Sequence, residues 1–117
     1  MSDRIAYAVT VAGGALLWIA TAKLAGRTEA WDAPTYWTIT YPLAIGLAGA
    51  VGFLAPRRAW RWGLAVFLAQ AVALAVAASS FGLMPLGMIL FGVLSMPAVA
   101  VATVAARLSP WRADAAP

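Results

Sequence analysis

The chain has 117 residues, of which 64% are hydrophobic and only 10% are charged. A soluble domain carries about 25% charged residues, and a chain this short has too little interior to hide so many apolar side chains from water. We therefore expect lipid to surround much of the protein, which we interpret as a single membrane domain covering residues 1–117.

The net charge of +4 does not indicate nucleic-acid binding, because the basic residues do not form one face of a soluble fold. They gather at the ends of apolar segments, where the positive-inside rule and anionic lipid headgroups account for them. The chain also has no cysteine and no histidine. Because disulfides, thiol nucleophiles and most transition-metal sites need these residues, we expect no cofactor and no metal.

Four apolar segments cover most of the sequence. A hydrocarbon core about 30 Å thick requires about 20 helical residues at about 1.5 Å each. The segments of suitable length are Ile5–Leu24, Trp37–Leu54, Trp62–Ser79 and Leu83–Ala106. They predict an all-α integral membrane protein, built as a bundle of four transmembrane helices.

The first segment also has one feature of a secretory signal peptide, since Ala20-Thr21-Ala22 matches the A-x-A pattern of a cleavage site. Its apolar run is longer than the usual run of about 7–15 residues in a signal peptide, and only Arg4 makes its amino-terminal flank basic. We therefore expect this segment to be retained as the first span.

The distribution of Lys and Arg predicts the orientation. Six of the eight lie at the N-terminus, in the second connection and at the C-terminus, whereas the other two lie in the first connection. The side richer in Lys and Arg is normally cytoplasmic. We expect a multi-pass protein of the plasma membrane, which is the inner membrane of a bacterium, with both termini in the cytoplasm.

Small residues predict how the helices pack, because burial alone does not hold helices together in lipid, whereas close backbone approach does. Gly46, Gly49 and Gly52 recur along the second segment, at the depth of Gly13 and Gly14 in the first. We expect these two helices to meet backbone to backbone. A second set of small residues is expected to pack within the bundle or, alternatively, to mediate homodimerisation: Ala65, Ala69, Ala73, Ala77, Gly87 and Gly92. We also expect the third and fourth segments to admit a partner helix at Ala65, Ala69, Ala73 and Gly87.

The third and fourth segments carry the deepest polar groups. Gln70 and Ser95 lie near mid-membrane, and Pro97 cannot donate a hydrogen bond to the carbonyl of Val93. These groups predict either a polar notch for a solute or an ion, or an interhelical hydrogen bond with a kink.

Two clusters of aromatic and charged residues mark the membrane surfaces. The outer one contains Glu29, Trp31, Asp32 and Trp37, and the inner one contains Arg57, Arg58, Trp60, Arg61 and Trp62. Aromatic rings favour the headgroup level, and arginines there attract anionic headgroups. We interpret the outer cluster as an interfacial belt or a contact for lipid or a partner. The inner cluster is either a lipid-headgroup site or charge that sets the topology.

No arrangement in this sequence predicts catalysis, because no nucleophile, metal ligand or oxyanion-binding group accompanies the carboxylates of the first connection. Two function classes remain open. The first is a non-catalytic accessory or scaffold subunit of a larger membrane complex. The second is a small-solute or ion transporter or channel that works as a homodimer. The expected partners are membrane lipids and other transmembrane helices, without nucleic acid.

Overall fold

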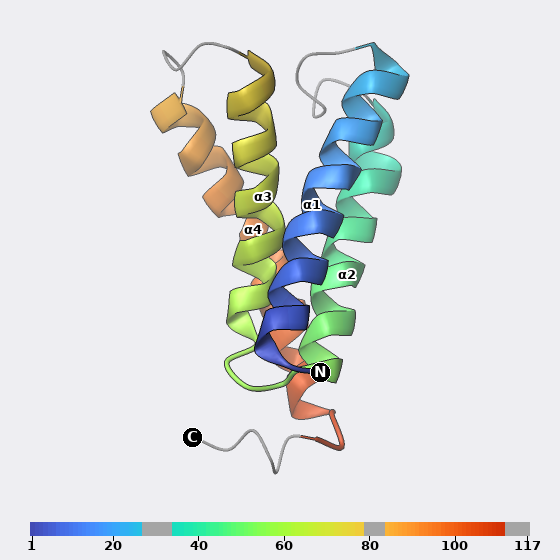
Figure 1. The fold of residues 1–117 in the computed structure, drawn as a ribbon, viewed down its shortest axis with the longest axis vertical. Coiled ribbons are helices and arrows are strands. Elements are labelled where there is room, and N and C mark those ends of the chain that lie inside the picture. The colour runs from blue at the N-terminus through green and yellow to red at the C-terminus, as the bar shows by residue number, and fades with distance from the viewer. Residues whose placement is uncertain (27–33, 79–83, 112–117) are drawn as a thin grey trace.

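The described residues form an up-and-down arrangement of four main helices, shown for a computed structural model in Figure 1. The structure describes residues 1–26, 34–78 and 84–111, with the backbone alone at residues 77–78 and 84–85. Its elements are α1 (Asp3–Ala25), the short π-helix η2 (Tyr36–Thr40), α2 (Tyr41–Leu54), α3 (Trp60–Ala78) and α4 (Met84–Arg107). The predicted all-helical architecture is confirmed.

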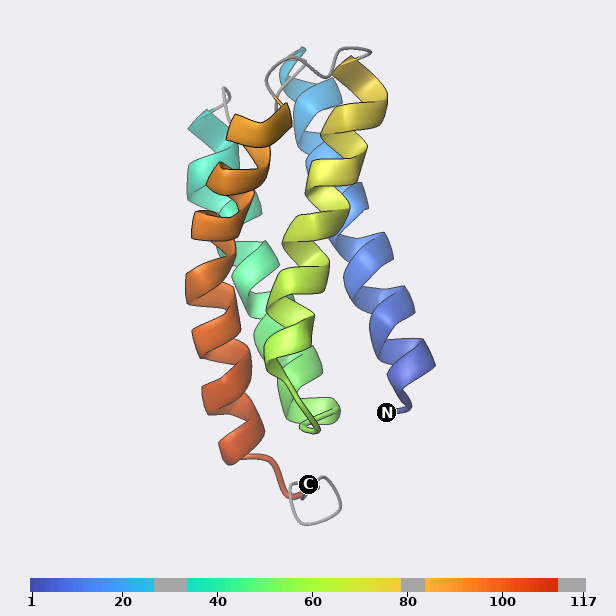
Figure 2. The same ribbon diagram turned by 90° about the vertical axis from the view of Figure 1, so that its left-hand side faces the viewer.

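Three helices in the described residues are long and apolar enough to cross a membrane. They are Asp3–Ala25, Tyr36–Leu54 and Leu86–Arg107, with 23, 19 and 22 residues. The described apolar stretch of α3, Trp60–Val76, is shorter. α3 nevertheless stands beside the other three helices over most of their length (Figure 2).

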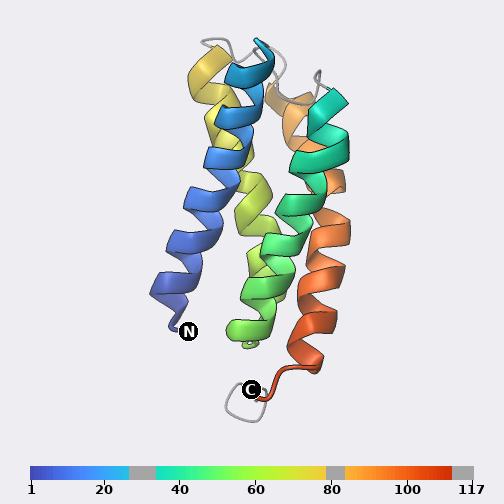
Figure 3. The ribbon, with the colours of Figure 1, turned by 90° about the vertical axis from the view of Figure 1, so that its right-hand side faces the viewer.

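The helices lie in the order α1, α3, α4, α2 around the bundle (Figures 1 and 3). α1 therefore packs mainly on α3, and α2 packs mainly on α4, while contact between α1 and α2 is sparse. The residue Met1 and the end of α4 lie at the same end of the bundle, together with the turn that joins α2 to α3 (Figure 1).

Local sequence explains where α1 begins and ends. The Ser2 side chain accepts a hydrogen bond from the Ile5 N–H at 3.3 Å, which caps a free donor of the first turn. At the other end Gly26 has φ of 67°, the left-handed conformation that glycine adopts without strain, and its N–H bonds to the carbonyls of Ala22 and Lys23.

A π-turn carries the chain into α2. The Tyr41 N–H donates to the carbonyl of Tyr36, five residues back instead of four. Pro42 follows, and in a regular α-helix its ring would crowd the carbonyl of Thr38, so the wider turn makes room for it. The same turn places Tyr36 in the interior, with 0% exposed, whereas Trp37 is 45% exposed. The sequence did not predict this π-turn.

Close backbone contacts at glycines join the helices. A Cβ added at Gly14 would collide with the carbonyl oxygen of Val66 on α3. At Gly52 it would lie 2.5 Å from the carbonyl oxygen of Ala102 on α4, and at Gly63 it would lie 2.5 Å from the backbone nitrogen of Val99. These contacts are backbone to backbone, and only residues without a side chain permit them.

The predicted backbone-to-backbone meeting of the first two helices at these glycines is wrong, and the two helices touch there only through a side chain. Gly14 packs on α3, Gly13 faces the side chain of Leu47, and Gly46 faces open space. Gly13, Gly14 and Gly46 were predicted to share a depth, but helices other than the predicted partner also lie beside each of them. Depth therefore does not determine which pair of helices meets.

Two glycine substitutions within α2 test this packing. We expect Gly52→Ala to lower the free energy of unfolding by about 1–3 kcal/mol, because its Cβ meets backbone atoms that cannot move aside. We expect Gly46→Ala to be neutral or stabilising by up to about 1 kcal/mol, since alanine favours helix and nothing lies within 4 Å. Unfolding of the purified protein in mild detergent measures both. Equal effects would contradict the assigned contact between α2 and α4.

Candidate functional site

A groove of about 1010 Å³ runs along the outside of the bundle between α1 and α3. These are the two helices nearest the viewer in Figure 1. Its lining residues from α1 are Tyr7, Val11, Ala15, Trp18, Ile19, Ala22 and Lys23. Those from α3 are Trp60, Arg61, Leu64, Ala65, Leu68, Ala69, Val72, Ala73 and Val76.

Alternation of small and large side chains shapes the groove. On α3 the alanines 65, 69 and 73 recur every four residues and therefore share one helix face. Ala65 and Ala69 are buried, whereas the neighbouring Leu68 and Val72 are 54% and 56% exposed. The small residues thus lie deep in the groove, and the larger aliphatic side chains extend outward beside them.

The position of the groove corrects one prediction. The alanine series was expected to form a contact surface together with Gly87 on α4. In the structure α3 and α4 pack closely against each other, and Gly87 is not among the groove residues. Ala65, Ala69 and Ala73 face the side of α1 instead. Ala77 is outside the described side chains.

A network around Arg61 lies at the end of the groove formed by the start of α1 and the start of α3. The Arg61 guanidinium donates to the Asp3 carboxylate at 3.3 Å and to the backbone carbonyls of Arg57 at 2.8 Å and Arg58 at 3.1 Å. It also lies 4.5 Å from the ring centroid of Trp62. Arg61 therefore ties the start of α1 to the turn before α3, and its charge is compensated inside the protein.

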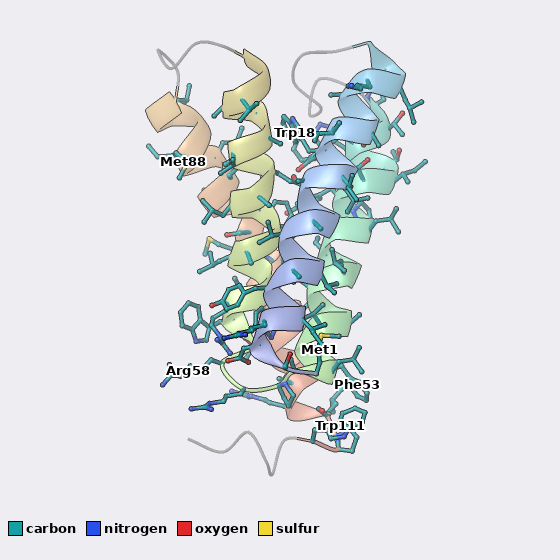
Figure 4. The ribbon with its side chains drawn as sticks, in the orientation of Figure 1. Met1, Trp18, Phe53, Arg58, Met88 and Trp111 are labelled. Carbon is teal, nitrogen blue, oxygen red and sulfur yellow. The ribbon has the colours of Figure 1, made fainter. Side chains whose placement is uncertain are left out.

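The predicted lipid-headgroup cluster contains residues with internal contacts and residues that are exposed. Trp62 is 0% exposed, and its indole N–H donates to the carbonyl of Ala55 at 2.8 Å, so the structure gives it an internal role. Arg57, Arg58 and Trp60 are exposed. Figure 4 shows Arg58 extending away from the lower end of the bundle. The headgroup hypothesis therefore rests on those three residues.

A buried hydrogen bond joins η2 to α3. The Tyr36 hydroxyl donates to Gln70 Oε1 at 2.8 Å, and both side chains are 0% exposed. Trp18 packs edge-on against Tyr36, with ring centroids 5.6 Å apart, and lies 5.3 Å from Phe91. Trp18, labelled in Figure 4, also lines the groove, so its ring connects the groove lining with Tyr36.

The Gln70 amide is only half satisfied. Its Nε2 has no hydrogen-bond partner among the described residues, although the side chain is fully buried. An unpaired buried donor normally costs about 1–3 kcal/mol. The sequence correctly indicated Gln70 as a buried polar side chain. Its partner Tyr36 was not predicted, because the π-turn that directs Tyr36 inward has no strong sequence signal.

The predicted convergence of Gln70, Ser95 and Pro97 is not observed as a hydrogen-bonded cluster in the described residues. The Ser95 hydroxyl donates to the carbonyl of Gly92 in its own helix at 2.7 Å. Pro97 is exposed within α4. The neighbouring Leu94 carbonyl instead accepts a hydrogen bond from Tyr41 at 2.9 Å.

Further polar contacts connect elements that the sequence did not pair. The hydroxyls of Thr21 and Thr40 form a buried hydrogen bond between α1 and η2. Near the other end, Ser109 donates to the carbonyl of Phe53 at 2.6 Å, and Phe53 packs edge-on against Trp111 (Figure 4). These contacts use ordinary Thr and Ser residues, whose pairing depends on the three-dimensional arrangement alone.

The predicted outer cluster lies mostly outside the described residues. This holds for Glu29, Trp31 and Asp32. Trp37 is described, and its ring packs edge-on against Tyr36 and Tyr41, with centroids 5.1 and 5.6 Å apart.

Comparison of the whole chain with protein-family models, curated proteins and solved structures finds no match.

The Tyr36–Gln70 contact is testable by a double-mutant cycle. Tyr36→Phe and Gln70→Leu remove the same interhelical hydrogen bond, so we expect a coupling energy of about 1 kcal/mol between them. The double variant should therefore lose less free energy of unfolding than the sum of the two single losses. Unfolding in detergent micelles measures this. As a control, Ser95→Ala should be additive with Tyr36→Phe, because Ser95 bonds within its own helix. Additivity of Tyr36→Phe with Gln70→Leu would show that the contact is absent.

Proposed function

We propose that this protein is a non-catalytic accessory subunit of a membrane complex, and that it binds a transmembrane helix of another protein in the groove between α1 and α3. All four helices cross the plasma membrane, with both termini in the cytoplasm. The observation that carries this proposal is the groove itself, an apolar channel along the flank of the bundle with alanines along its depth.

The size of the groove suits a helix. From Tyr7 to Lys23 on α1 the groove residues span 16 helical steps, or about 24 Å. This length corresponds to about four turns of a partner helix, at about 5.4 Å a turn.

Its length favours a helix over a lipid chain. An acyl chain covers one leaflet, which is about half of a hydrocarbon core about 30 Å thick. The groove is longer than one leaflet and runs without interruption past the midplane. Its alanines also permit a second helix to approach α1 and α3 closely, and such approach is the main source of helix association in lipid.

The composition of the helices favours binding over chemistry or coupled transport. No Asp, Glu, Lys or Arg occurs in 5–22, 37–54, 62–79 or 83–106. Proton or ion relays in membranes rely on such residues near the midplane. The polar Tyr36–Gln70 pair is buried behind aromatic rings instead of lining the groove.

One observation favours the second candidate function, a transporter or channel that works as a homodimer. The Gln70 Nε2 donor is buried without a partner in the described residues, as expected for a donor that binds a solute. On this reading Trp18 would have to move to connect the groove with Gln70. Purified protein that moves a solute across liposomes, with loss of that activity in Gln70→Leu, would favour transport over the accessory role.

Site-specific crosslinking in native membranes tests helix docking. The chain has no cysteine, so single-cysteine variants report one position each. Val72 and Val93 are matched, because each is a valine in a helix and each is 56% exposed, but only Val72 lines the groove. We expect Val72→Cys to crosslink to one defined protein, at a peptide within a transmembrane helix.

We expect Val93→Cys to give no such product at the same expression level. Equal adducts from both positions would indicate random collisions in the bilayer. If Val72→Cys yields no protein adduct although a membrane-permeant thiol reagent labels it, the groove is open to lipid and the proposed role is wrong.

The orientation has its own test. Because six of the eight Lys and Arg lie toward one side, we expect both termini in the cytoplasm. An alkaline phosphatase fused after Pro117 should be inactive, and a fluorescent protein fused there should be bright. Active phosphatase at this position would contradict the orientation or the number of spans.

A further inference from the structure

We infer that the helix bound in the groove carries a carboxylate that faces Lys23, close to the end of the groove opposite Arg61. This inference rests on the proposed function, because it names the chemistry of the partner that the groove accepts. It follows from the unequal electrostatic environment of the two cations that line the groove.

No acidic side chain of the described residues lines the groove, whereas Lys23 and Arg61 both do. Arg61 is compensated by the Asp3 carboxylate and by two backbone carbonyls. Lys23 has no hydrogen bond or ion pair within the described part of the chain and is exposed. Among the described residues the two ends of the groove thus differ, because a carboxylate lies beside Arg61 and none lies beside Lys23.

Docking a helix changes the surroundings of Lys23. Without a partner, its long side chain can extend along the apolar surface and keep the ammonium in the headgroup region. A helix laid along the groove covers part of this route and removes water from the ammonium. A cation that loses water without a counter-charge is costly, and an opposing carboxylate offsets the cost. Arg61 needs no carboxylate from the partner helix, because it is already paired with Asp3.

The same charges disfavour a second copy of this chain as the occupant. Two copies related by a two-fold axis present the same surface to each other. With both copies in the orientation that the charge distribution predicts, Lys23 of one copy would approach Lys23 of the other at the same depth. Like charges at an interface are unfavourable, and the apolar segments 5–22, 37–54, 62–79 and 83–106 of this chain offer no Asp or Glu to a groove. A different protein, with a carboxylate in the docked helix itself, is therefore the better occupant.

Designed peptides test the inference without knowledge of the natural partner. The full chain with Val72→Cys is reconstituted in phosphatidylcholine vesicles with a synthetic Leu–Ala transmembrane peptide. The peptide carries one central cysteine and either Glu or Gln near one end. We expect the Glu peptide to form about three times more disulfide with the protein than the Gln peptide does, as a weak ion pair near the membrane surface implies.

Substitution of Lys23 provides the matched control. With Lys23→Gln in the same Val72→Cys chain, the Glu and Gln peptides should crosslink equally. With Lys23→Glu, a peptide that carries Lys at the same position should crosslink best. This exchange of preference requires a direct interaction between position 23 and the peptide, which a change in overall folding would not produce.

The outcomes separate this inference from the proposed function. Equal crosslinking of the Glu and Gln peptides to the chain with Lys23, at a level above that of Val93→Cys, would overturn the carboxylate and leave helix docking intact. Crosslinking no higher than that of Val93→Cys for every peptide would overturn helix docking itself. Disulfide dimers of Val72→Cys that form without peptide and resist its addition would identify a second copy as the occupant and overturn the inference.

Discussion

Close approach of helix backbones is the constraint on which this bundle depends. In the membrane location that we propose, lipid tails would be as apolar as the leucine and valine side chains, so burial of these side chains would stabilise the bundle little. Contact instead requires small residues, and three glycines supply it: Gly14 against α3, Gly52 against α4, and Gly63 between α3 and α4. Each meets backbone atoms of its neighbour. Together they fix the order α1, α3, α4, α2, which leaves α1 attached mainly through α3.

The groove is a consequence of this order. α1 and α3 touch at Gly14 and Val66, and beyond this contact the alanines of α3 do not fill the space on the outer side. In a soluble protein, a cavity lined by alanines would be filled by larger side chains, because voids forfeit packing energy. In a membrane the same surface is a ready contact for another helix. In the proposed accessory role, the partner helix fills the groove that the helices of this chain leave open.

The sequence predicted the positions of the helices along the chain better than it predicted which helices pack together. Hydrophobic length placed the four helices correctly, since it reflects the thickness of a bilayer and needs no knowledge of tertiary structure. Helix pairing was predicted less well, because Gly13, Gly14 and Gly46 share a depth but not a partner. Gln70 was identified by its polarity, whereas Tyr36 was not, since its inward direction arises from the π-turn before Pro42. Trp62 was assigned to the surface because tryptophan beside arginine is typical of the headgroup region, yet it is buried under Arg61.

The most direct test of the account is a structure of the protein extracted with its native lipids in polymer-bounded discs, without detergent. Such extraction retains both lipids and partners, so the groove keeps its natural occupant. We expect helical density of about 24 Å along α1 and α3, with a carboxylate beside Lys23. Density for lipid chains alone between these helices, or a shift of α1 that closes the groove against the alanines of α3, would contradict it.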